Sequence, residues 1–129
     1  MTYAPEWTSD RPAGAAAIMQ WLSFAAKEVS IGLQLSRLHF IDPDENIDLA
    51  RAQRDGIRAL GILDRVLARR DWLALDRPTI ADVAVFPYVA LAREGRLDLD
   101  AYPHALAWID RIVGMPGYVP MAGVPEPGS

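Results

Sequence analysis

The chain of 129 residues contains no cysteine, which excludes a disulfide framework, a thiolate metal site and a cysteine nucleophile. It also has no apolar run close to the roughly 18 residues that a membrane-crossing helix needs. Its first residues, MTYAPEWTSD, lack both the basic region and the apolar stretch of a secretion signal. We therefore expect a soluble, cytoplasmic protein that does not bind to membranes.

Sequence motifs for several kinds of catalytic and metal site are also missing. There is no G-x-S-x-G elbow, no phosphate-binding glycine loop and no dinucleotide fingerprint. The stretch DPDENIDLARAQ resembles a calcium loop, but Ile47 and Gln53 occupy the positions that require glycine and a bidentate glutamate. The two histidines, His39 and His104, lie at a predicted helix end and a predicted helix start. We expect neither a metal site nor a catalytic constellation.

The composition is that of one globular domain. Apolar residues make up 51% of the chain, which is enough to bury a sizeable core at this length. The net charge of −4 argues against nucleic acid as the main partner.

Helical patterns dominate the chain, and no convincing strand is visible. We expect a linker at residues 1–9, a helical domain at 10–119 and a flexible tail at 120–129. The predicted helices cover about residues 10–40, 46–70, 79–93 and 103–113.

The first predicted helix has two apolar stripes, whereas a helix that covers one face of a small bundle needs only one. The first stripe contains Ile18, Leu22, Ala25, Val29 and Leu33, and the second contains Trp21, Phe24, Ile31, Leu35 and Leu38. The helix is therefore either central within its own bundle, or its second stripe contacts another domain or subunit.

The second predicted helix has an apolar face and an arginine-rich face. The arginines lie opposite the leucines, at positions 51, 54, 58, 65 and 69. The simplest interpretation is a solvated face partnered by Asp55 and other acids. The alternative is an anion-binding or dimer-facing surface.

A capping box opens the third predicted helix. The Thr79 hydroxyl can accept from the Asp82 N–H, while the Asp82 carboxylate can accept from the Thr79 N–H. We expect Asp82→Ala to destabilise the fold by about 1–2 kcal/mol. Pro87 follows inside the same helix, where proline costs roughly 3 kcal/mol and produces a kink that surrounding packing must offset.

Four residues are candidates for an apolar substrate pocket. Trp21 and Phe24 could form one wall, with Lys27 at its polar edge, and Tyr88 could offer a hydroxyl to a cleft. Ordinary core packing and a structural hydrogen bond of Tyr88 are the alternatives.

Three stretches together resemble one known family. DWLALDRPTIADVAVFPYV is similar to the capping-box region of the C-terminal, all-helical domain of glutathione S-transferases, although Leu75 stands where that family often has glycine. AIMQWLSFAAKEV and YPHALAWIDRIVGMPGY are similar to the first and closing helices of that domain. The resemblance covers residues 7–119.

The resemblance implies an all-α bundle of four to six helices. In that family, Thr79 and Asp82 would be folding determinants, and the first helix would contribute to the substrate pocket and the dimer contact. The implied core of the capped helix is Ile80, Val83, Phe86 and Val89.

In glutathione transferases, a thioredoxin-like N-terminal domain binds glutathione and supplies the activating Ser, Tyr or Cys. No β-α-β pattern is present here, so none of those activating residues can be assigned to a position of this sequence. The chain itself is expected to hold no cofactor, and glutathione enters only with a thioredoxin-like domain.

Three functions follow as hypotheses. The chain is a stand-alone module that forms a homodimer and holds an apolar small molecule, or it is the substrate-binding half of a transferase whose thioredoxin-like half lies elsewhere. The third hypothesis is a scaffold for protein assembly. In each case we expect the isolated chain to be catalytically inactive.

Overall fold

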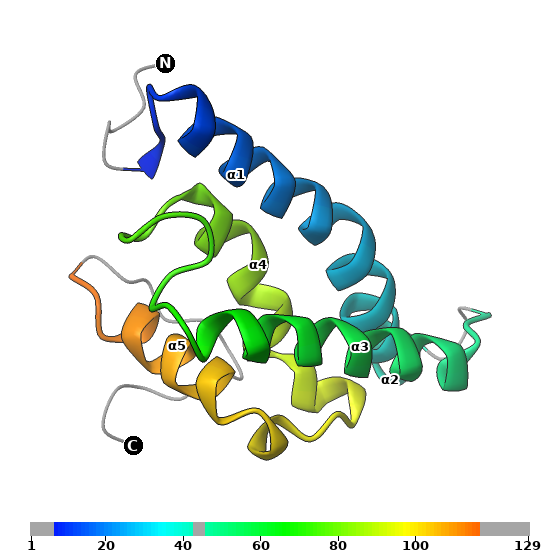
Figure 1. The fold of residues 1–129 in the computed structure, drawn as a ribbon. Helices are drawn as coiled ribbons and strands as arrows, with labels where there is room; N and C mark the ends of the chain where they lie inside the picture. The colour runs from blue at the N-terminus through cyan, green and yellow to red at the C-terminus, as the bar shows by residue number, and fades with distance from the viewer. Residues whose placement is uncertain (1–6, 43–45, 117–129) are drawn as a thin grey trace.

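The computed structural model describes residues 7–42 and 46–116, and within these ranges the chain forms helices and turns without a strand (Figure 1). The all-α fold expected from the sequence is therefore confirmed. The predicted tail and residues 1–6 of the predicted linker lie outside the described residues. The elements are α1 (Pro12–Phe24), the π-helix η2 (Ala25–Gln34), α2 (Leu35–Ile41), α3 (Leu49–Leu67), α4 (Ile80–Ala90), the 3₁₀ turns η3 (Ala92–Gly95) and η4 (Leu99–Ala101), and α5 (Pro103–Val113).

The helices α1, η2 and α2 form one continuous arm along a side of the molecule, close to the predicted range of 10–40 (Figure 1). The π-helical middle of this arm was not predicted. In a π-helix each backbone N–H bonds to the carbonyl five residues back, which is rare in proteins. The arm crosses α3 very closely, because a Cβ added to Gly32 would lie 2.3 Å from the Gly56 nitrogen. Glycine at position 32 therefore lets the two backbones meet.

The ends of two helices differ from the prediction. The helix α3 begins later than expected, directly after Asp48, whose carboxylate accepts from the Arg51 N–H at 3.1 Å. The helix α4 ends at Ala90 and not at residue 93. The chain turns there so that Gly95 can pack against α2, where an added Cβ would lie 2.8 Å from the Ser36 Cβ.

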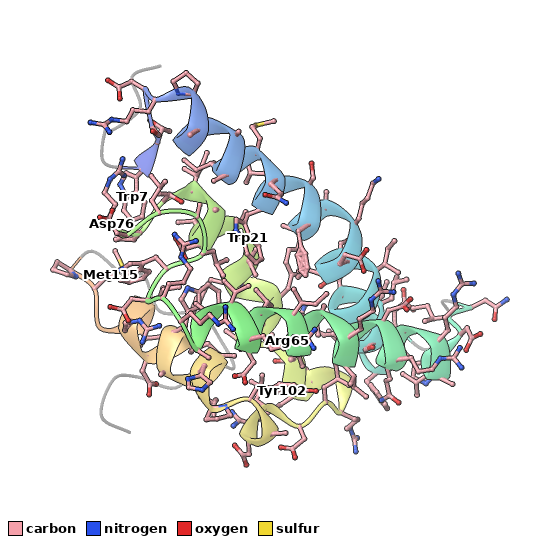
Figure 2. All side chains as sticks on the ribbon, viewed as in Figure 1. Trp7, Trp21, Arg65, Asp76, Tyr102 and Met115 are labelled. Atoms are coloured by element: carbon pink, nitrogen blue, oxygen red, sulfur yellow. The ribbon has the colours of Figure 1, made fainter. Side chains whose placement is uncertain are left out.

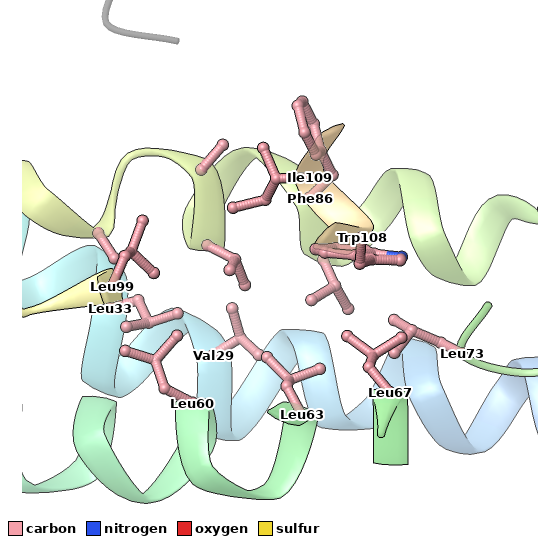
Figure 3. Packing of buried hydrophobic residues seen from close by; sticks show 14 of the residues in the cluster. Val29, Leu33, Leu60, Leu63, Leu67, Leu73, Phe86, Leu99, Trp108 and Ile109 are labelled. Carbon is pink, nitrogen blue, oxygen red and sulfur yellow. The ribbon is translucent and has the colours of Figure 1, made fainter. Parts of the chain in front are cut away.

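The hydrophobic core surrounds α4 and lies between η2, α3 and α5 (Figure 3). Its fully buried apolar side chains include Val29, Leu33, Leu60, Leu63, Leu73, Val85, Val89, Leu99 and Trp108.

The core set implied for α4 is partly wrong. Phe86 and Val89 are buried, but Ile80 is only half-buried and Val83 is 56% exposed. The helix is rotated so that Asp82 points inward, where its carboxylate has three N–H partners. This rotation turns Val83, the next residue along α4, outward.

The Asp82 carboxylate joins three parts of the chain. A capping box is present, in which the Thr79 hydroxyl also accepts from the Ala81 N–H at 3.2 Å and Asp82 accepts from the Thr79 N–H at 3.0 Å. The same carboxylate, 1% exposed, accepts from the Leu73 N–H at 3.0 Å and from the Trp108 indole N–H at 2.9 Å. It therefore ties the loop before α4 and the helix α5 to the first turn of α4.

Pro87 lies inside α4, and the helix continues through it to Ala90. Proline has no N–H to donate to the carbonyl oxygen of Val83, four residues earlier. Because Val83 is 56% exposed, water can reach this side of the helix. Water can therefore offset part of the lost hydrogen bond.

The start of α5 is capped by another helix. Its own N-cap residue, Tyr102, makes no side-chain capping bond. Instead, the Asp64 carboxylate of α3 accepts from the His104 N–H at 2.9 Å and from the Ala105 N–H at 3.1 Å. A helix begins with N–H groups that lack partners within the helix, and Asp64 satisfies two of them.

Candidate functional site

Two of the four predicted pocket residues form an aromatic pair. The rings of Trp21 and Phe24 are 5.3 Å apart between centroids and meet edge to face at 85°. Both side chains are half-buried and pack against the main core. Trp21 lies between α1 and α4 (Figure 2). The pair thus has one side packed against the core and one side exposed to solvent.

Tyr88 and Lys27 come from two elements that pack together, α4 and η2. Tyr88 is half-buried and packs against the same core as the aromatic pair. Lys27 is exposed on η2. The structure therefore places three aromatic candidates on one core and leaves the lysine on the outer surface.

The outward side of α4 is apolar throughout. The only charged residue in the sequence of this helix is Asp82, and its carboxylate is buried. The residues of α4 that are not buried are Ile80, Val83, Ala84, Pro87 and Tyr88. Of these, Ile80, Ala84 and Tyr88 are half-buried and still pack against the core, whereas Val83 faces outward. A helix that is apolar on all sides is typical of a fully surrounded position. In this chain, however, Val83 remains 56% exposed.

A hollow of about 460 Å³ lies between the arm and the start of α3. Ile31 and Leu35, both on the second predicted stripe, line it together with Asp48, Arg51 and Asp55 of the α3 region. Ile31 is 49% exposed. The sequence indicated the apolar stripe but not the hollow, because the residues that face the stripe depend on where the two helices cross.

A second hollow of about 270 Å³ lies between α3 and the turns before α5, and its lining includes Ile57, Arg96 and Tyr102. Arg96 has the left-handed φ of 63°. Burial raises the pKa of Tyr102 above its ordinary value, and the carboxylates of Asp64 and Asp98 raise it further. Neither of these two hollows is lined by the four predicted pocket residues.

Among residues 7–42 and 46–116, no three His, Asp or Glu side chains are grouped in a way that could hold a metal ion. None of the helices in these ranges has both the length and the apolar character that crossing a membrane requires.

Comparisons with known proteins point to one family. The model of the glutathione S-transferase C-terminal domain matches residues 15–116. The disulfide-bond oxidoreductase YfcG of Escherichia coli is 30% identical over 105 residues, which are 78% of this chain and 48% of that protein. The glutathione S-transferase verG of Clonostachys rogersoniana is 40% identical over 62 residues, which are 43% of this chain and 26% of that protein.

Solved structures share the fold as well. A crystal structure of a glutathione S-transferase from Xanthobacter autotrophicus superimposes with a TM-score of 0.82 at 29% identity. The match covers 88% of this chain and 57% of the other. The chain thus spans about half the length of YfcG and little more than half of this structural neighbour.

Proposed function

Because this chain belongs to the glutathione S-transferase C-terminal domain family, we propose that it is the substrate-side helical module of a glutathione-transferase-like protein. In this role its apolar side chains form one wall of a pocket for an apolar electrophile. A thioredoxin-like domain, on this or another chain, binds glutathione and activates its thiol. The thiolate attacks the electrophile, forms the new C–S bond and expels the leaving group.

The apolar outer side of α4 is the observation that carries this proposal. Burying a Val-sized side chain contributes about 1.5–3 kcal/mol, so an exposed Val83 on an otherwise apolar helix favours a covering partner. The half-buried Trp21–Phe24 pair and Tyr88 extend the apolar surface from α4 to the arm. Aromatic side chains of this kind provide apolar area at low conformational cost, as a pocket for apolar molecules requires.

Dimer formation is the second part of the proposal. Ile31 on the second stripe of the arm is 49% exposed, and Phe40 and Ile41 at its end are 40% and 54% exposed. A second copy of the chain that covers these side chains would remove apolar surface from water. Light scattering across a concentration series measures this directly. A monomer at every concentration would remove the dimer contact from the proposed function.

Ligand binding is tested on the isolated chain by NMR. The probe is S-(2,4-dinitrophenyl)glutathione, the conjugate of glutathione with an aryl halide, whose aromatic group represents the apolar substrate. We expect its addition to shift the backbone amide signals of Trp21, Phe24 and Tyr88, while that of Arg58 on the far side of α3 stays unchanged. Shifts confined to other regions, or no shift at millimolar probe, would contradict the pocket.

Catalysis is tested separately. The purified chain, mixed with glutathione and 1-chloro-2,4-dinitrobenzene, should form the conjugate no faster than the uncatalysed background. Turnover clearly above background would show that the chain activates glutathione itself. It would contradict the proposal that a thioredoxin-like domain supplies this activation.

A further inference from the structure

Four arginines form a narrow stripe along α3, and a fifth, Arg69, lies in the turn that follows the helix. At about 100° per residue, the four helical side chains project within a sector of roughly 60° and extend over about 21 Å. All five are exposed. Arg65, in the last turn of the helix, lies on the outward side of α3 (Figure 2). The arginine stripe consists of Arg51, Arg54, Arg58 and Arg65.

The stripe has no ion-pair partner within the described part of the chain. The two ion pairs there join Arg37 to Glu94 at 2.7 Å and Arg93 to Asp100 at 2.8 Å. Neither involves α3. The side chains of the stripe are therefore available to an anionic group from outside.

The spacing of the arginines is unfavourable for an isolated helix. Arg54 and Arg58 are four residues apart on α3, and Arg51 is three residues before Arg54. Like charges at these spacings lie side by side on a helix and destabilise it. A solvated face normally alternates charges of both signs, which stabilise the helix instead. Asp55, four residues after Arg51 and three before Arg58, offsets only part of this repulsion. The stripe therefore keeps an excess of positive charge that an anionic partner would neutralise.

We propose that the arginine stripe docks an elongated acidic segment of a partner protein, with carboxylates repeating about every 10 Å. Arg51, Arg58 and Arg65 recur every seven residues, or about 10.5 Å along the helix. A partner helix with an acid at every seventh position presents the same spacing. Guanidinium groups bind carboxylates through paired, charge-assisted hydrogen bonds.

Two further observations favour this kind of partner. A Cβ added to Gly61, within the stretch of α3 that carries the stripe, would have no atom within 4 Å, so a partner backbone can approach closely there. The chain as a whole carries a net charge of −4, which disfavours long polyanions such as nucleic acid that would extend past the stripe. The inference does not depend on the proposed pocket, because α3 presents the stripe on its outer side.

The test uses two fluorescent helical peptides of about 22 residues, which is long enough to span the stripe. In one peptide a glutamate occupies every seventh position, and in the other the same glutamates are gathered at one end. A single-stranded DNA oligonucleotide of equal net charge is the third probe. The variant Arg58→Gln/Arg65→Gln removes two charges from the stripe. Its control, Arg11→Gln/Arg93→Gln, removes two exposed charges elsewhere, one of which pairs with Asp100.

We expect the spaced peptide to bind more tightly than the clustered one, and its binding to weaken as salt is raised. The stripe variant should bind it about tenfold more weakly, because each exposed ion pair contributes a factor of up to about five. The control variant should bind like the native chain. No binding, equal binding of the two peptides, or tighter binding of the oligonucleotide would overturn the proposal.

A stability measurement gives an independent result. At low salt, the stripe variant should unfold at the same temperature as the native chain or at a slightly higher one, since it relieves repulsion between neighbouring arginines. A clearly lower unfolding temperature would show that the arginines stabilise the chain by themselves, and it would remove the reason for a partner.

Discussion

Replacing Asp82 with alanine removes the acceptor of three N–H groups at once. These groups belong to Leu73, Thr79 and Trp108, at distances of 2.9 to 3.0 Å from the carboxylate. Asp82 itself is 1% exposed, and Thr79, Leu73 and Trp108 are each fully buried. Water therefore has little access to the donors that the substitution leaves without a partner.

The magnitude follows from the number of donors. A buried donor without an acceptor costs about 1–3 kcal/mol, and a lost helix cap costs about 1 kcal/mol. Part of this summed cost is recovered when the loop before α4 relaxes. We therefore expect Asp82→Ala to lower the free energy of unfolding by about 4 kcal/mol. This exceeds the 1–2 kcal/mol expected from the sequence, because the capping box accounts for only one of the three bonds. Asp82→Asn keeps one acceptor, the amide oxygen, and should cost about half as much.

Urea unfolding followed by far-ultraviolet circular dichroism measures the change. The slope of the unfolding free energy against urea should stay constant, so that the shift in midpoint reports stability. Asp110→Ala, an exposed acid on α5, is the matched control and should change stability by less than about 0.5 kcal/mol. If the free energy of unfolding of Asp82→Ala stays within about 1 kcal/mol of that of the native chain, the three hydrogen bonds do not stabilise the core to the expected extent.

Two more predictions concern a helix crossing and an ionisable side chain. Gly32→Ala should destabilise the chain by at least about 2 kcal/mol, because its Cβ would lie 2.3 Å from the backbone of α3. Gly61→Ala should stabilise the chain by up to about 1 kcal/mol, because an added Cβ meets open space there. Thermal unfolding of the two variants measures both changes. Burial, and then the carboxylates of Asp64 and Asp98, raise the pKa of Tyr102 in the folded chain above its ordinary value of 10.0. The stability that this group contributes is therefore fully present below pH 10.0, and it is lost as the pH rises through the folded pKa. Tyr102→Phe should therefore lose less stability between pH 9.5 and 12 than the native chain does, and parallel curves would contradict this.

Local patterns in the sequence predicted most of the helices. The range of α5 was correct, since Pro103 fixes its start and apolar residues repeat with helical spacing to Val113. The contact between Trp21 and Phe24 is also local, because residues three apart on a helix lie side by side. Features of this kind depend only on neighbours in the chain.

Features that depend on distant residues were missed. The inward rotation of Asp82 requires Trp108, 26 positions later, and it turned Val83 out of the predicted core. The crossing of the arm over α3 rests on Gly32 and Gly56, whose approach no spacing in the sequence reveals. The hollow between the arm and α3 follows from the same crossing, so its polar lining was not predictable.

The cap of α5 has a consequence for how the chain folds. Asp64 lies 40 positions before His104, so the first turn of α5 gains its acceptor only after α3 and α5 have docked. An eleven-residue helix is marginal by itself in water. The closing helix should therefore form late and cooperatively with docking, after α3 has already assembled. In native-state hydrogen exchange, the amides of His104 and Ala105 should then open together with the α3–α5 contact and not by independent fraying.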